Sequence, residues 1–173
     1  LAETIDRYSA VPVDRILEIG CGPAPHAGEL IRRGYRYLGL DNSRVMLNYA
    51  SEAWQRICPA PLLFEANMVS FEAPETADFA FVMLGSLYLN SIEEMHSHFD
   101  SVAASLRRGG LYFLDCCIHP LDCTIHVVCG PFALTHRQCN AEDRDERQSK
   151  PEGKLQAAFA DIGLRLGNLF VDQ

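Results

Sequence analysis

The sequence lacks a long uncharged hydrophobic run, a secretory leader and any excess of basic residues. No apolar stretch approaches the roughly 20 residues that a membrane-spanning helix requires, and the first residues do not show the charged and apolar segments of a signal peptide. Lys and Arg number 15 against 23 Asp and Glu, a net charge of −8, which argues against a non-specific grip on nucleic-acid phosphates. We therefore expect a cytoplasmic protein that has neither a membrane nor a nucleic acid as a partner.

An initial Met is missing, and so is any pair of cysteines with C-x-x-C spacing. The chain begins with Leu1, so a leader or an N-terminal cap can precede it in a longer protein. Disulfide frameworks belong to small secreted domains, and the seven cysteines here are scattered. We expect most of them to be reduced and to pack as small apolar residues.

The length and the hydrophobic content predict one domain with a core of its own. The chain has 173 residues, of which 48% are hydrophobic, and this is enough to bury a core. We predict a single domain over residues 1–173, with its core in residues 13–118. Residues 119–153 form a variable segment on the substrate side, and residues 154–173 supply a last helix (154–162) and a last strand (164–171).

A glycine turn near the start organises the chain. An apolar run in residues 15–19 predicts a buried strand, Gly20 and Gly22 follow at once, and residues 27–34 predict a helix that ends at a glycine. Strand, glycine turn and helix form the first half of a nucleotide-binding βαβ unit, because a turn without side chains lets the backbone approach a ligand closely. A glycine turn with no ligand is the alternative.

Two carboxylates flank this turn in the predicted fold. Glu18 stands two residues before Gly20, where it would repel a pyrophosphate but suits a cationic ligand. The third glycine of the dinucleotide pattern G-x-G-x-x-G is replaced by Pro25. Asp41 ends the next predicted strand, residues 35–41, about 20 residues past the turn, where nucleotide folds place a carboxylate on ribose hydroxyls. Alternatively, Asp41, Asn42 or Ser43 can act as the N-cap of the helix predicted over residues 44–57.

Three segments carry a resemblance to a known family. Residues 17–24, Leu-Glu-Ile-Gly-Cys-Gly-Pro-Ala, resemble motif I of the class I S-adenosylmethionine-dependent methyltransferases. Residues 38–47 and 106–115 are similar to later segments of the same family. The resemblance covers about residues 13–118 and implies a Rossmann-like α/β fold, a doubly wound and mainly parallel seven-stranded sheet. The antiparallel strand that completes such a sheet is expected near Ile125, unless the chain lacks its end or an internal loop.

The resemblance also implies a cofactor, S-adenosyl-L-methionine, which leaves as S-adenosyl-L-homocysteine. It places Glu18 near the methionine amino group, Asp41 on the ribose and Met46 on the adenine; ordinary core packing is the alternative for Met46. Asn67 stands where the family usually has Asp, and its amide oxygen can still accept a hydrogen bond, although a simple turn is the alternative. The predicted cofactor-binding residues are Glu18, Gly20, Cys21, Gly22, Asp41, Asn42, Met46, Asn67, Met68 and Leu84.

The sequence leaves the catalytic residue unknown. Methyl transfer from a sulfonium is an in-line displacement in which the enzyme mainly positions two reactants, and a base is needed only if the nucleophile must lose a proton. Tyr88 and His119 are weak candidates, with Asn90 and Asp115 near the expected reactive end. Tyr88 can equally be a wall of the acceptor site, and His119 an exposed loop histidine.

The fifth predicted strand, residues 111–115, follows a helix predicted over residues 92–106, which has Ser91 as its N-cap and ends at Arg107-Arg108-Gly109-Gly110. A segment rich in thiols and imidazoles follows this strand. These groups are zinc ligands, but their spacing is not that of a structural zinc site, so no metal is predicted. A thiol-rich site for a soft acceptor such as an arsenical is a further alternative. The residues concerned are Cys116, Cys117, His119, Cys123, His126, Cys129, His136 and Cys139.

We therefore predict an S-adenosylmethionine-dependent methyltransferase that acts on nitrogen or oxygen of a small-molecule acceptor, as a monomer or homodimer. Two alternatives stay open: a non-catalytic domain of the same fold that binds the cofactor or a partner, and an NAD-dependent oxidoreductase. Glu18 and Pro25 argue against the oxidoreductase.

Overall fold

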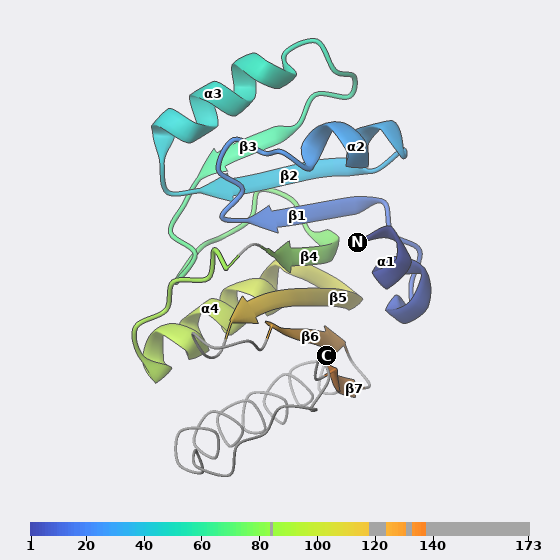
Figure 1. Cartoon of the computed structure of the whole chain (residues 1–173), viewed down its shortest axis with the longest axis vertical. Coiled ribbons are helices and arrows are strands. Elements are labelled where there is room, and N and C mark those ends of the chain that lie inside the picture. Colours follow the sequence, from blue (N-terminus) through green and yellow to red (C-terminus); the bar gives the residue numbers. More distant parts are fainter. Residues whose placement is uncertain (84, 118–123, 131–132, 138–173) are drawn as a thin grey trace.

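The computed structural model describes residues 1–83, 85–117, 124–130 and 133–137 (Figure 1). Its strands form one seven-stranded sheet in the order β3-β2-β1-β4-β5-β6-β7. The elements are α1 Ala2–Tyr8, β1 Arg15–Ile19, α2 Ala27–Arg32, β2 Arg36–Asp41, α3 Arg44–Trp54, β3 Leu62–Glu65, β4 Ala77–Val82, α4 Ile92–Ser105, β5 Leu106–Cys117, β6 Thr124–Gly130 and β7 Ala133–Arg137.

Strands β1 to β5 run parallel, so their carboxyl ends meet at one edge of the sheet. In the centre, Leu17 of β1 pairs with Leu38 of β2 on one side and Ala80 of β4 on the other. The chain therefore reverses its direction of winding between β1 and β4. In open α/β sheets, ligands bind beyond the carboxyl ends of the strands at this reversal.

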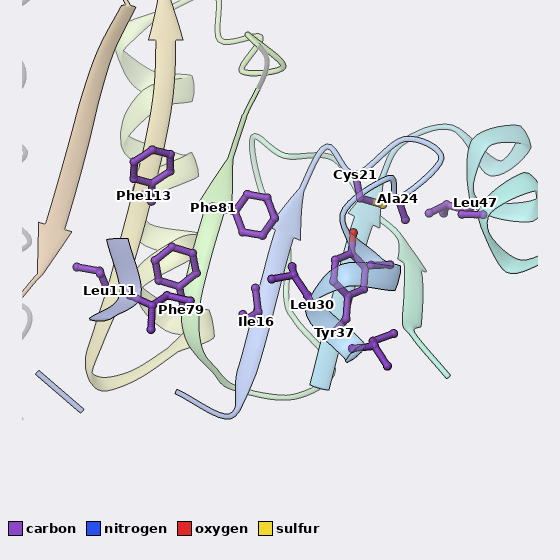
Figure 2. Close-up of a cluster of buried hydrophobic side chains, with 14 residues drawn as sticks. Ile16, Cys21, Ala24, Leu30, Tyr37, Leu47, Phe79, Phe81, Leu111 and Phe113 are labelled. Atoms are coloured by element: carbon purple, nitrogen blue, oxygen red, sulfur yellow. The ribbon is translucent and has the colours of Figure 1, made fainter. Parts of the chain in front are cut away.

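Both faces of the sheet are covered by helices, which explains why β1 and β4 are buried along almost their whole length. On one face, Ile16, Phe79 and Phe81 pack in a cluster with residues of α1, α2 and α3 (Figure 2). On the other face, Leu17 and its strand neighbours pack against Phe99 and Val102 of α4. The predicted doubly wound sheet is confirmed.

The sheet is completed by two antiparallel strands. β6 pairs antiparallel with β5, with Cys116 opposite Ile125, and β7 pairs antiparallel with β6. The expectation that the region near Ile125 supplies the antiparallel strand is therefore confirmed. The helix and strand predicted in residues 154–171 lie outside the described residues.

The start of β5 corrects one predicted boundary. The Arg-Arg-Gly-Gly run at residues 107–110 was expected to close the preceding helix, with the strand beginning at Leu111. Instead β5 begins at Leu106, which pairs with Ala77, and the register then shifts so that Leu111 pairs with Phe79. Gly109 has a φ of +84°, a conformation that glycine adopts without strain, so the chain bulges here and stays in the sheet.

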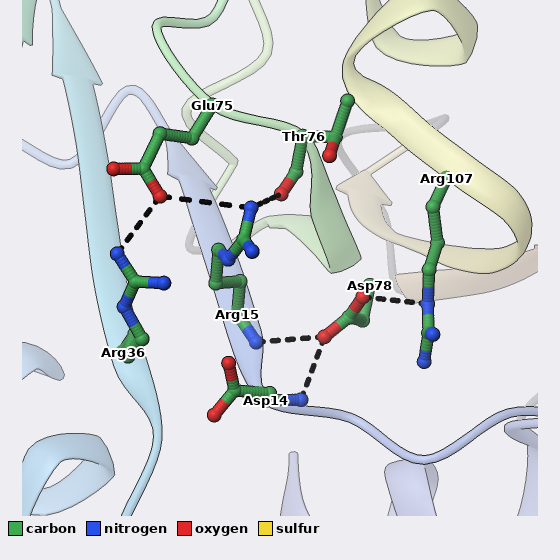
Figure 3. Close-up of polar contacts among 7 residues, drawn as sticks. All are labelled: Asp14, Arg15, Arg36, Glu75, Thr76, Asp78 and Arg107. Carbon is green, nitrogen blue, oxygen red and sulfur yellow. Dashed lines mark hydrogen bonds and ion pairs between the residues drawn. The ribbon is translucent and has the colours of Figure 1, made fainter.

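One buried carboxylate joins three segments at the amino edge of the sheet (Figure 3). Asp78, 8% exposed, accepts the backbone N–H groups of Asp14 and Arg15 at 2.7 and 2.8 Å. Its other oxygen lies 2.6 Å from Nε of Arg107 in an ion pair. By contrast, Glu75 forms a more exposed ion pair with Arg36 nearby.

Replacing Asp78 should cost far more stability than replacing Glu75. Asp78→Ala leaves two backbone N–H groups and one guanidinium without their acceptor, so we expect a loss of about 3 kcal/mol in the free energy of unfolding. Glu75→Ala removes only exposed ion pairs and should cost less than about 1 kcal/mol. Urea unfolding followed by circular dichroism measures both, and equal losses would contradict the assignment of Asp78.

Candidate functional site

The turn after β1 bends through three left-handed residues, Gly20, Gly22 and Ala24, with φ of +70°, +51° and +53°. A Cβ on Gly20 would lie 3.3 Å from the Met68 methyl carbon and 3.4 Å from the Ser86 Cβ. A Cβ on Gly22 would meet no described atom within 4 Å. The backbone at Gly22 therefore faces space that a side chain would occupy, as expected where a ligand approaches the main chain.

Ala24 is a feature that the sequence analysis missed. It shares the left-handed backbone of the two glycines, and its side chain is fully buried. Its carbonyl accepts a hydrogen bond from the Trp54 indole at 3.0 Å, which joins the turn to α3. Its spacing is the available signal, because residues 20, 22 and 24 alternate, whereas the third glycine of G-x-G-x-x-G would stand at Pro25.

Asp41 is joined directly to this turn. One carboxylate oxygen accepts the backbone N–H of Gly22 at 2.7 Å, and the other accepts that of Ser43 at 2.8 Å. A carboxylate has about four lone-pair sites, so Asp41 can accept further hydrogen bonds. The N-cap of α3 is Ser43 rather than Asp41, because the Ser43 hydroxyl accepts from the N–H of Met46.

Glu18 lies under the turn with a partner on each oxygen. It is 4% exposed; one oxygen is 2.8 Å from Nδ1 of His26 and the other accepts the Tyr37 hydroxyl at 2.5 Å. The hydrogen bond to Glu18 raises the pKa of His26, although burial opposes this. Burial, followed by the Glu18 charge, raises the pKa of Tyr37. A buried carboxylate requires such donors, and neither was identified from the sequence.

Cys21 is buried beneath the same turn (Figure 2). Its backbone N–H donates to the carbonyl of Leu40 at 2.9 Å, a second link between the turn and β2. Burial, together with the charges of Glu18 and Asp41, raises the pKa of its thiol to about 12. Cys21 is therefore a neutral packing residue and not a nucleophile.

Met68, after β3, connects the turn to the loop after β4. Its sulfur accepts the backbone N–H of Tyr88 at 3.4 Å, and its carbonyl lies 2.7 Å from Nδ1 of His98. His98 is fully buried in α4, and its Nε2 lies 2.8 Å from the Tyr112 hydroxyl. These partners assign the proton to Nδ1, since a carbonyl can only accept. Burial lowers the pKa of His98, so the ring is neutral.

The remaining predicted residues lie at the start of α3, after β3 and after β4. Met46 is 43% exposed in the first turn of α3 and thus is not core, and Asn42 is exposed beside Asp41. The side-chain oxygen of Asn67 accepts the N–H of Val69 at 2.9 Å, as in a simple turn. Tyr88 is 75% exposed. Leu84 and His119 lie outside the described residues.

Asn90 and Asp115, the other two polar candidates, lie just before α4 and near the end of β5. Asn90 donates its backbone N–H to Glu94 at 2.6 Å, next to the N-cap of α4. Asp115 is described by its backbone, which pairs with His126 of β6. The side chains of the thiol- and imidazole-rich segment are outside the description. Within the described part of the chain, no group of three or more His, Cys, Asp or Glu could hold a metal ion, and no helix is long and apolar enough to cross a membrane.

The structure thus brings together a group of predicted residues along the carboxyl edge of β1 to β4. Asp41 contacts Gly22, Gly20 lies against Met68, and Met68 contacts the backbone of Tyr88. Residues 16–110, more than half of the chain, match the family model described as "Methyltransferase domain".

The chain belongs to this family. A curated relative from Geobacillus sp. (strain WCH70), "Putative methyltransferase GWCH70_2453", is 28% identical over 112 residues. The match covers 64% of this chain and 45% of the relative, so the chain spans less than half the length of that protein. The sequence-based prediction of a methyltransferase is therefore confirmed at the level of the family.

Solved structures share the fold at low sequence identity. CalS10, an amino pentose methyltransferase from Micromonospora echinaspora solved with S-adenosylmethionine bound, has a TM-score of 0.63 and 20% identity, over 94% of this chain and 80% of that one. KedS8, a sugar N-methyltransferase from Streptoalloteichus sp. ATCC 53650, has a TM-score of 0.61 and 16% identity, over 94% and 75%. DesVI from Streptomyces venezuelae has a TM-score of 0.61 and 19% identity, over 92% and 78%.

The buried His98 should make stability depend on pH. Its pKa is lowered in the folded protein, so as the pH falls below about 6.5 the unfolded chain binds a proton that the folded protein does not, and stability decreases. His98→Gln removes this titration. We expect the stability advantage of the wild type over the variant to shrink by about 1 kcal/mol between about pH 7.5 and about pH 5.5.

Urea unfolding at the two pH values measures this difference. A stability difference between wild type and His98→Gln that stays constant over this range would contradict the burial of a neutral His98.

Proposed function

We propose that this chain binds S-adenosyl-L-methionine and transfers its methyl group to a nitrogen or oxygen atom of a small molecule. The observation that carries the proposal is the Asp41–Gly22 contact beside unfilled space at Gly22, located where the sheet reverses its winding. This is the position at which α/β folds bind nucleosides. The family membership supports the same reaction.

The residues present fit an adenosyl ligand with a cationic end. Asp41 keeps lone pairs for the two hydroxyls of a ribose after accepting from Gly22 and Ser43. Gly22 offers close approach to the main chain, since a side chain there would fill the adjacent space. Glu18 supplies a buried negative charge under the turn, which favours a cation over a phosphate. Met46, exposed on α3, offers an apolar surface near Asp41.

When bound, the cofactor supplies a methyl group on a sulfonium, from which a neutral thioether leaves. The chain's own residues therefore need only hold the two reactants in line. Tyr88 is exposed on the loop after β4 and is anchored through its backbone to Met68, so we assign its ring to the wall of the acceptor site. A base is needed only for an acceptor that is protonated at the reacting atom, and His119 and Asp115 remain the candidates.

A small acceptor is favoured over a nucleic acid by charge. The net charge of −8 disfavours phosphate binding, and the structural neighbours CalS10 and KedS8 are named as methyltransferases of an amino pentose and a sugar. The alternative is a domain that binds the cofactor or a partner without catalysis. An assay of the purified protein with amino sugars and radiolabelled S-adenosylmethionine distinguishes a methyltransferase from a domain that only binds, because the methyltransferase transfers the label to the sugar.

Gly22→Ala tests the cofactor site, and Gly34→Ala is its matched control. Both glycines have positive φ, +51° and +97°, and neither would place a Cβ within 4 Å of a described atom. Each substitution should therefore cost about 1 kcal/mol of stability through the backbone alone. Gly34 lies before β2, at the opposite edge of the sheet. We expect Gly22→Ala to weaken S-adenosylhomocysteine binding at least about tenfold, and Gly34→Ala to leave it unchanged.

Isothermal titration calorimetry measures this affinity. Absence of heat with S-adenosylhomocysteine for the wild type, or equal weakening by both substitutions, would overturn the proposal. NAD serves as the negative control ligand.

A further inference from the structure

The partners of Glu18 differ in their access to solvent. Tyr37 is 2% exposed and donates its hydroxyl to one oxygen of Glu18 from β2. His26 contacts the other oxygen from the start of α2, and its side chain is 27% exposed. The His26 ring also packs edge-on against Phe81 of β4, with 5.7 Å between ring centroids. Of the two hydrogen-bond donors to Glu18, His26 is therefore the one that is exposed enough for a ligand to contact.

The charges around His26 come from several elements. Glu18 of β1 contacts it directly, and Tyr37 of β2 and the Cys21 thiol interact with Glu18 from below the turn. Asp41 adds a second negative charge near Cys21, and the Leu1 amino group slightly opposes the positive charge of His26. Glu18 dominates this set, since its hydrogen bond is the largest influence on the pKa of His26 and raises it.

We propose that His26 is a positioning residue of the cofactor site, and that the ammonium group of the cofactor binds at the Glu18–His26 pair with release of the His26 proton to solvent. This inference rests on the proposed function. The ammonium group and a protonated imidazole are two cations that would share one buried carboxylate, and they repel each other at that short distance. Loss of the ring proton at Nε2 removes that repulsion and keeps the Nδ1 donor on Glu18.

The consequence is a coupling between pH and cofactor affinity. At a pH below the raised pKa of His26, binding must displace a proton, so the affinity falls as the pH falls, by at most about tenfold per pH unit. At a pH above it, the ring is already neutral and the affinity reaches a plateau. By linkage, the bound ligand lowers the pKa of His26.

Calorimetry in two buffers of different ionisation enthalpy counts the released protons. We expect more than about half a proton to be released per S-adenosylhomocysteine at about pH 6.5, because His26 is more than half protonated there before binding. Methylthioadenosine, which has the nucleoside and thioether but no amino group, should bind without proton release.

Two variants test whether His26, rather than another group of the site, releases the proton. His26→Asn keeps an N–H donor near Glu18 but cannot titrate, so its binding of S-adenosylhomocysteine should release no proton and should be independent of pH between about 5.5 and about 7.5. Tyr37→Phe removes the other donor and keeps His26, so proton release should persist. The His26 ring resonance in wild-type NMR titrations gives a readout that requires no variant, and S-adenosylhomocysteine should lower the pH of its midpoint.

The results that would contradict this inference differ from those that would contradict the proposed function. Binding of S-adenosylhomocysteine by the wild type without proton release, or unchanged release in His26→Asn, would overturn this inference alone. No binding of S-adenosylhomocysteine in any buffer would overturn both the proposed function and this inference.

Discussion

The site depends on one hydrogen bond, from the Gly22 amide to the carboxylate of Asp41. It joins the turn that follows β1 to the last residue of β2, across 19 positions of sequence. A charged acceptor makes this bond stronger than a neutral one. It also requires the left-handed backbone at Gly22 and Gly20, since the turn must direct its amide toward β2. The geometry of the turn and the position of Asp41 are therefore a single constraint.

Glu18 shows how a carboxylate can be buried while one of its partners remains in contact with solvent. Two donors from different elements replace the water that it loses on burial. One of them, Tyr37, is fixed within the sheet, whereas His26 begins a short helix and retains contact with solvent. In the binding mode proposed above, Tyr37 holds Glu18 in place and His26 responds to the ligand.

The sequence predicted the parallel half of the fold well, because β1 and β4 each contain an apolar run and the glycine turn between strand and helix is distinctive. The N-cap at Ser91 and the glycine at position 34 were also predicted correctly. The early start of β5 was missed because Arg-Arg-Gly-Gly is typical of a helix end. The Glu18–Tyr37 contact was not predictable from local pattern, since it depends on the offset between two strands.

The carboxylate of Asp78 has a consequence for how the chain reaches this structure. It accepts the amides of Asp14 and Arg15 from 64 and 63 positions away, so the entry to β1 is complete only after β4 has docked. The Asp41–Gly22 bond needs a loop less than a third as long. Loop-closure entropy orders these events: the glycine turn and β2 can associate early in folding, and the central strand pair closes afterwards as the slower step.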